Sequence, residues 1–218
     1  EDAQAIRDEV QGIQYMSVGV RTQQPVVVAA TNWRTSINGI DVEWPQIRSW
    51  PIKYGSFFSQ QDVTISAKVA VLGLTVSNNL FGEDSDPTGE IIRIGKEPFK
   101  VIGVMTSKGA STGGDNQDDS ILIPYTTCQK KLMGIQNIQN MTISAASADE
   151  VVLVKERVAT VLRTRHRIFP GDNDDFMLST LEEMMAMRTE TTRTMTALLS
   201  GIAGVSLLVG GIGIMNIM

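Results

Sequence analysis

The chain has 218 residues, 42% of them hydrophobic, which is enough for one large domain or two small ones. Its formal net charge of -5 argues against a nucleic-acid binder, because affinity for phosphate backbones comes from clustered Lys and Arg. The single cysteine, Cys128, excludes an intramolecular disulfide framework and a multi-cysteine metal site, and we expect a buried thiol there.

Helix and strand patterns alternate at the start of the chain. The chain begins at Glu1 without Met or a signal-type apolar segment, so we expect a fragment of a longer protein. Apolar residues at helical spacing predict an amphipathic helix over residues 1–11. Alternating and β-branched runs predict three strands, over residues 15–21, 26–30 and 34–40. A short helix is expected after them, over residues 44–50.

Short strands separated by turn residues follow in the middle of the chain. The pattern predicts a strand over residues 68–73 and a short helix over 74–81. It then predicts a hairpin formed by residues 90–94 and 99–105, and a last strand over 121–123. The stretch 107–120 is rich in Gly, Ser and Asp and predicts a mobile loop.

A strand, a helix and a second strand are predicted after Met141. The strands cover residues 142–145 and 176–178, and the helix runs from a cap at Ser147 to about Arg165. With the pattern at the N-terminus, this gives two βαβ-type units around a strand-rich insert. The expected fold class is therefore α+β with a small inserted subdomain.

The strongest signal lies at the C-terminal end. Residues 194–218 contain no charged side chain, and about 20 apolar residues suffice to span a bilayer, so we predict a transmembrane helix there. Thr180 and Glu183 form a capping-box pattern that predicts a helix start at about residue 180. Because no proline follows, a polar stalk over residues 181–193 is expected to run unbroken into the membrane.

Small residues recur along one stripe of this predicted transmembrane helix. Ala197, Gly201, Gly204 and Gly211 follow one another at spacings of four, three and seven residues. Small side chains let another helix backbone approach closely. These four residues are therefore the predicted helix-packing site, inside a larger membrane domain.

Few clusters of residues could form a catalytic or binding site, and each of them has a simple structural interpretation. The sequence contains no P-loop pattern, and no nucleophile, base and orienting residue converge, so we predict no catalytic, cofactor-binding or metal-binding residue. Two acidic runs lack the spacing of a calcium loop and are expected to be solvated turns: Asp115, Asp118, Asp119 and Asp172, Asp174, Asp175. One basic cluster suits a helix C-terminus: Arg163, Arg165, His166, Arg167.

Five aromatic residues are candidates for a substrate or adaptor surface, although core packing is the simpler expectation for most of them: Trp33, Trp44, Trp50, Phe57, Phe58.

Several motifs occur in a fixed order along the chain. VLG, LFG, DP-G and VIGV lie between Val69 and Met105, and SLLVGGIGIMNIM ends the chain. Three further segments fit the same order: Asn38–Gly39, Gly55–Asp62 and Asp174–Phe176. Together they resemble, over nearly the whole chain, the extracytoplasmic core domain of MacB-type ABC transporter permeases in the FtsX-like superfamily. One departure is Ser56, where this family usually has Arg.

The resemblance implies a division of the chain into four parts. A porter-like subdomain takes residues 1–56 and 124–180, and an inserted β-rich sabre subdomain takes residues 57–123. A stalk helix follows over residues 181–193, and the start of a transmembrane helix over 194–218. It also implies a permease that dimerises in the bacterial inner membrane, with this domain on the periplasmic or extracellular side. The chain itself then needs no cofactor and is not an enzyme.

The implied function is mechanotransmission. In such permeases an ABC ATPase domain that binds ATP and Mg moves the membrane helices, and a periplasmic adaptor (membrane fusion) protein, in some systems with an outer-membrane channel, exports small molecules or peptides. Two alternatives from the same superfamily stay open, a lipoprotein-releasing permease and a regulator of a cell-wall hydrolase. The GGIGIMN run favours the first function.

Overall fold

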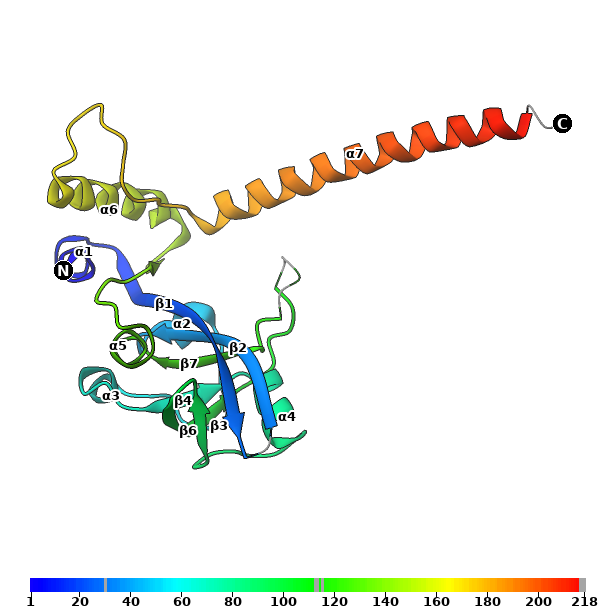
Figure 1. Cartoon of the computed structure of the whole chain (residues 1–218). Helices are drawn as coiled ribbons and strands as arrows, with labels where there is room; N and C mark the ends of the chain where they lie inside the picture. Colours follow the sequence, from blue (N-terminus) through cyan, green and yellow to red (C-terminus); the bar gives the residue numbers. More distant parts are fainter. Residues whose placement is uncertain (30, 112–113, 115, 216–218) are drawn as a thin grey trace. The chain divides into compact units, whose positions relative to one another are not determined.

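The structure is a computed structural model that describes residues 1–29, 31–111, 114 and 116–215, with side chains as far as Leu207 in the last helix. The chain divides into two compact units, Glu1–Glu150 (unit 1) and Val151–Met218 (unit 2). Figure 1 follows their elements along the chain.

Unit 1 mixes strands and short helices. Its helices are α1 (Asp2–Glu9), α2 (Trp44–Arg48), α3 (Gln60–Thr64), α4 (Leu74–Phe81) and α5 (Tyr125–Thr127), with a π-helical turn η1 (Cys128–Met133) and a 3-10 turn η2 (Ala148–Glu150). Its strands are β1 (Ile13–Val28), β2 (Thr31–Ile40), β3 (Ile52–Gly55), β4 (Val69–Leu72), β5 (Ile91–Ile94), β6 (Glu97–Met105), β7 (Ser120–Pro124) and β8 (Asn140–Ala145). The expected α+β class is confirmed.

Six strands of unit 1 form a closed ring. Each is hydrogen-bonded to two neighbours in the order β1, β2, β7, β4, β6, β5, and β5 returns to β1. The β2–β7 and β4–β6 ladders are parallel, and the other ladders of the ring are antiparallel. The first part of β1 lies beyond the ring and pairs with β8, and β3 adds to β6.

Side chains from all six ring strands fill the interior. Because side chains alternate between the two faces of a strand, every second residue can point inward. Thus Ile92 and Ile94 of β5 and Phe99 and Val101 of β6 are at most 1% exposed and belong to one hydrophobic cluster. The ring is therefore a packed core.

Strands β4 and β7 are buried on both faces. Val71 and Leu122 point away from the ring interior and join a second hydrophobic cluster, together with Trp50, Phe58 and Val63. This arrangement explains why both strands read as continuous apolar runs in the sequence, since neither face meets water.

The predicted hairpin and N-terminal strands are present. Strands β5 and β6 pair across a tight turn in which Ile94 lies opposite Glu97 and Gly95 has a φ of +59°. A positive φ is readily adopted by glycine, which suits it to this turn. The strand expected over 15–21 and the first three residues of the one expected over 26–30 are parts of the single strand β1, which is one continuous blue ribbon in Figure 1. Ala29 lies in the following turn, and Ala30 lies outside the described residues.

One expected strand is absent. Residues 176–178 form no strand, so the second strand-helix-strand unit lacks its last strand. Met177 is 88% exposed, which shows that the short apolar run does not mark a buried face. The described part of the loop over 107–120 is hydrogen-bonded around Asp118, and Ala110 forms a bridge with Asn116, while its expected mobility stays a prediction.

Unit 2 contains the helices α6 (Val151–His166) and α7 (Leu181–Met215). The expected helix from Ser147 to about Arg165 is confirmed as α6 preceded by η2. The long helix expected from residue 180 is also confirmed, and Figure 1 draws it without a break from orange to red. The transmembrane segment predicted over 194–218 lies partly outside the described residues. Among the residues that are described, no helix has the length and apolar character needed to cross a membrane.

Candidate functional site

Asp118 organises the loop between β6 and β7. Its side chain is 4% exposed. The carboxylate accepts hydrogen bonds from the Ser107 hydroxyl at 2.8 Å and from the backbone N–H groups of Lys108 and Gly109 at 2.7 and 3.0 Å. The expectation that Asp118 is a solvated turn residue was therefore wrong. A carboxylate in a Gly- and Asp-rich stretch carries no local sign of the backbone amides that bury it.

Two carboxylates of the acidic run in this loop accept hydrogen bonds from other groups of the protein. Asp119 accepts a hydrogen bond from the indole N–H of Trp33 at 2.8 Å, and Asp118 is bonded as described above. Asp115 lies outside the described residues. In the part of the chain that the structure describes, no group of three or more His, Cys, Asp or Glu side chains is arranged to hold a metal ion.

Replacing Asp118 with alanine is expected to lower the free energy of unfolding by about 2 kcal/mol, because two backbone amides lose a charged acceptor in a partly buried place. The change can be measured by urea unfolding followed through tryptophan fluorescence, since Trp33, Trp44 and Trp50 all lie in unit 1. Asp86→Ala is the matched control, because Asp86 also accepts from a backbone N–H and a hydroxyl but is exposed. An equal loss in both variants would contradict this role of Asp118.

Cys128 is buried, as expected. It has no exposed surface and belongs to the main hydrophobic cluster. Burial raises the pKa of its thiol from 9.0 to about 11, against a smaller opposing effect of the Gly39 backbone. A nucleophilic cysteine needs a lowered pKa, so this thiol is a structural residue.

The Cys128 thiol is expected to react slowly with Ellman's reagent at pH 8 while the chain is folded, because only about one thiol in a thousand is then ionised. In concentrated guanidinium chloride it should react fully within minutes. The folded-state pKa of about 11 lies above the unfolded value of 9.0, so the free energy of unfolding should fall as the pH rises through this window. Rapid reaction of the native chain at pH 8 would show that the thiol is accessible.

The aromatic candidates mostly belong to the core. Trp50 and Phe58 are buried in the second cluster, and Trp44 and Phe57 pack against it. The rings of Trp44 and Trp50 lie 5.6 Å apart, and those of Phe57 and Phe58 are stacked at 4.1 Å. Trp33 packs against the main cluster. Core packing, the simpler expectation, therefore accounts for these side chains.

In unit 2 the basic cluster and the second acidic run pair with each other. We call residues 167–180, which connect α6 to α7, the strap. Arg163 forms an ion pair with Asp174 and also donates to the carbonyl oxygens of Phe169 and Asp172 at 3.0 and 3.4 Å. His166 Nδ1 lies 2.7 Å from an Asp175 carboxylate oxygen. The basic residues do end a helix, as expected, and two of them also hold the strap.

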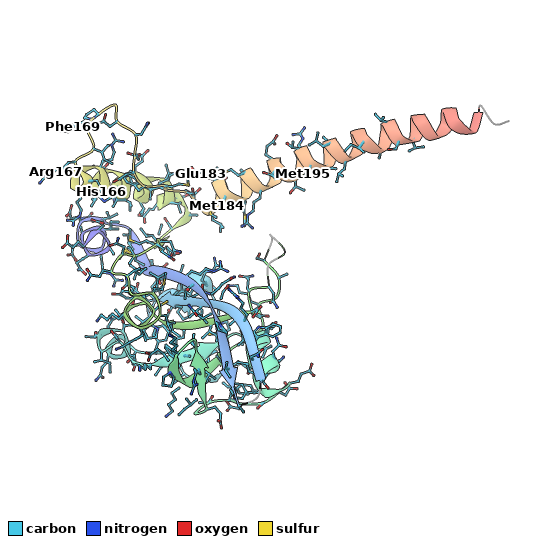
Figure 2. The ribbon with its side chains drawn as sticks, viewed as in Figure 1. His166, Arg167, Phe169, Glu183, Met184 and Met195 are labelled. Carbon is cyan, nitrogen blue, oxygen red and sulfur yellow. The ribbon has the colours of Figure 1, made fainter. Side chains whose placement is uncertain are left out.

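The helix C-terminus and the strap are ordered by further contacts. Arg167, just after α6, has a φ of +58°, and the Ile168 N–H donates to the Arg163 carbonyl at 2.9 Å, which closes the end of the helix. The Phe176 ring meets the His166 ring edge-on with centroids 6.0 Å apart. Phe169 itself is 71% exposed, and Figure 2 shows it at the turn beyond His166 and Arg167.

The start of α7 is fixed by Glu183. The predicted capping box is confirmed, because the Thr180 N–H donates to Glu183 at 3.0 Å and the Glu183 N–H donates to the Thr180 hydroxyl at 3.1 Å. Lys155 of α6 donates to both carboxylate oxygens of Glu183 at 2.6 and 2.7 Å. The Lys155 ammonium group, helped by the Thr180 N–H, holds the pKa of Glu183 below its ordinary value.

The predicted helix-packing residues lie on α7. At about 100° per residue they fall within an arc of about 80° of the helix. An added Cβ at Gly201 or Gly204 would meet no heavy atom within 4 Å among the described residues. Ala197 is exposed, and Gly211 lies outside the residues whose side chains are described. Their role in helix packing stays a prediction.

Known proteins are similar to the larger part of this chain. Residues 1–161 match the family described as MacB-like periplasmic core domain. The chain is 39% identical over 184 residues to the macrolide export ATP-binding/permease protein MacB of Wolinella succinogenes, covering 84% of this chain and 28% of that protein. It is 38% identical over 182 residues to the pyoverdine export ATP-binding/permease protein PvdT of Pseudomonas syringae pv. syringae, covering 84% and 27%. The chain thus spans less than a third of the length of these curated relatives.

Solved structures share the fold. The periplasmic region of MacB from Actinobacillus actinomycetemcomitans superposes with a TM-score of 0.67 at 22% identity, covering 76% of this chain and 73% of that chain. The extracellular domain of the ABC-type transporter YknZ from Gram-positive bacteria gives a TM-score of 0.64 at 18% identity, covering 75% and 83%. The chain belongs to the family of MacB-like periplasmic core domains, found in MacB- and PvdT-type ABC transporter permeases.

Proposed function

We propose that this domain passes ATP-driven movement of membrane helices to an adaptor-dependent efflux assembly. The observation that carries the proposal is α7, a helix of 35 residues without a break. At 1.5 Å per residue it is about 52 Å long, and a helix of this kind transmits displacement along its axis. Its first turn is tied to α6 through Glu183 and Lys155, so displacement does not end in a loose linker.

We propose the four-part division implied by the resemblance for this chain. The porter-like subdomain would take residues 1–56 and 124–180, with the sabre subdomain at 57–123. Both parts contribute strands to the closed ring, which suits subdomains that move together. The stalk would be 181–193, and the uncharged composition of 194–218 supports entry into the membrane there.

The partners follow from the same proposal. A nucleotide-binding domain, on this polypeptide or another, would bind ATP and Mg. A second permease copy would pair with this one, and the stripe of Ala197, Gly201, Gly204 and Gly211 would pack against a neighbouring membrane helix. A periplasmic adaptor would bind the domain outside the inner membrane, with an outer-membrane channel beyond it. The relatives are named for macrolide and pyoverdine export, which makes these two compound classes the first substrates to try.

The proposal is tested by locking the stalks of two copies together. Cys128 is the one cysteine of this chain and is buried, so a cysteine introduced at each position from 184 to 193 in turn is the more reactive thiol of the two. Cysteines in other parts of the complete permease are first replaced with serine. Where two copies become cross-linked, efflux of a macrolide from cells should stop and return on reduction. Continued efflux with the stalks fully cross-linked would contradict mechanotransmission.

The adaptor is tested separately by co-purification. The complete permease should retain a periplasmic adaptor protein after mild solubilisation. Retention of an acylated protein in place of an adaptor would favour lipoprotein release, and retention of a cell-wall hydrolase would favour the regulatory alternative. Either result would overturn adaptor-dependent efflux.

A further inference from the structure

The strap returns along α6 and delivers the chain to the start of α7. Its contacts with α6 follow a consistent order: Asp174 and Asp175 meet Arg163 and His166 near the end of the helix, and Glu183, just after the strap, meets Lys155 near its beginning. The segment from Asp174 to Glu183 therefore runs antiparallel to α6. Figure 2 shows the two ends of this path, with His166 at one and Glu183 at the other.

The three basic residues share one side of α6. At about 100° per residue, Lys155, Arg163 and His166 fall within an arc of about 80°. Val154, Val158 and Leu162 are buried and occupy the adjacent side. The helix thus separates an apolar side, which supplies burial, from a basic side, which receives the strap.

Charged side chains make several of the contacts that hold this segment. The strap contains no helix or strand between residues 168 and 180, so no backbone ladder fixes it in the described structure. An exposed ion pair contributes about 0 to 1 kcal/mol, too little to hold a segment against a pulling helix by itself. Two ion pairs, Lys155–Glu183 and Arg163–Asp174, act on the same segment with the His166–Asp175 hydrogen bond and two hydrogen bonds from Arg163 to carbonyl oxygens. Together these contacts hold the segment more firmly than one isolated pair would.

We propose that the pairs Lys155–Glu183, Arg163–Asp174 and His166–Asp175 form a clamp that makes α6 and the first turn of α7 move as one element. This inference rests on the proposed function, and it assigns positioning roles to Lys155 and Arg163. Displacement of α7 reaches Glu183 in its first turn, and Lys155 carries it directly into α6. Without the clamp, the strap would take up the displacement by changing its own conformation.

Glu183 has two roles that the test must separate, since it caps α7 and also pairs with Lys155. Glu183→Gln keeps an oxygen that can accept from the Thr180 N–H but removes the charge. Lys155→Met removes the other charge and leaves the cap untouched, while Lys155→Arg keeps a cation in place. Lys68→Met is the matched control, because Lys68 pairs with Glu97 at the same distance of 2.6 Å in unit 1.

The first measurement is amide hydrogen exchange of the complete permease over residues 174–186. Lys155→Met and Glu183→Gln should speed exchange there by up to about fivefold, the largest effect that the loss of one exposed ion pair allows, and Lys155→Arg and Lys68→Met should leave it unchanged. Unchanged exchange in Lys155→Met would overturn the clamp, whatever the export assay gives.

The second measurement is the amount of macrolide exported per ATP hydrolysed. Lys155→Met and Glu183→Gln should lower this ratio about fivefold while ATP hydrolysis continues, and Lys155→Arg should restore it. A normal ratio in Lys155→Met, with faster exchange, would overturn the role of the clamp in coupling and leave the proposed function standing. If the wild type and Lys68→Met also show no ATP-dependent export, the proposed function fails, and the clamp loses its role with it.

Discussion

Proline in place of Thr189 is expected to abolish efflux by the complete permease while ATP hydrolysis continues. Thr189 lies in the third turn of α7 and is exposed, so the substitution removes no packing contact with the described residues of this chain. Inside a helix, proline removes a backbone hydrogen bond and clashes with the preceding turn, which costs about 3 kcal/mol and bends the helix. A bent rod loses displacement at the kink, so we expect macrolide efflux to fall at least about tenfold.

Thr189→Ala is the control for this experiment, because it removes the hydroxyl that donates to the Met185 carbonyl and leaves the helix intact. It should export like the wild type. Circular dichroism of both variants checks that only the proline variant loses helix. Full efflux by a Thr189→Pro permease would mean that α7 need not be a continuous rod, which contradicts the proposed function.

Alanine in place of Gly73 is expected to destabilise unit 1 by about 3 kcal/mol, because a methyl group has no room there. An added Cβ would lie 2.2 Å from the Asp118 carbonyl oxygen and 2.9 Å from that of Ser120. Both atoms belong to backbone, and the Gly73 N–H donates to the same Ser120 carbonyl at 2.8 Å. The clash therefore forces apart the end of β4 and the segment that holds Asp118.

Gly19→Ala is the matched comparison for Gly73→Ala. Its added Cβ would also be too close to a neighbour, at 2.0 Å, but that neighbour is the side-chain oxygen of Asn140, which can rotate away. Urea unfolding of the two variants should therefore separate them by about 2 kcal/mol or more. Equal stabilities would show that the β4 end can shift freely, contrary to its packed surroundings.

Patterns within short stretches of sequence predicted the helices and strands whose conformation depends on neighbouring residues. The β5–β6 hairpin follows from apolar alternation around Gly95, and α7 follows from the capping box of Thr180 and Glu183 and the lack of a later proline. In both cases, residues within a few positions of one another decide the backbone conformation. These are the parts of the fold that the sequence predicts best.

Long-range pairing is the part that the sequence does not reveal. The ring closes because residues 36–40 of β2 lie beside residues 120–124 of β7, more than eighty positions further on. No alternation pattern states which strand is the neighbour of another. The wrong strand over 176–178 has a related cause, since a run of three apolar residues looks the same whether it joins a sheet or leads into a helix.

The candidate site also has one part that the sequence could predict and one part that it could not. The stripe of Ala197, Gly201, Gly204 and Gly211 could be predicted because it depends only on helical periodicity, although its packing role is untested. The clamp could not, because Lys155 and Glu183 are 28 positions apart and meet only if the strap returns along α6. Opposite charges in a sequence do not say which of them will pair.

The closed ring also affects how copies of the domain meet one another. Each of the six ring strands is bonded on both sides, and the additional strands β3 and β8 have only four and six residues. An unpaired strand edge is a template on which another chain can add, and it leads to fibrous aggregation. Among the described strands, long open edges of this kind are scarce. If two copies pair as proposed, they should therefore recognise each other through side chains, and such contacts can form and separate repeatedly.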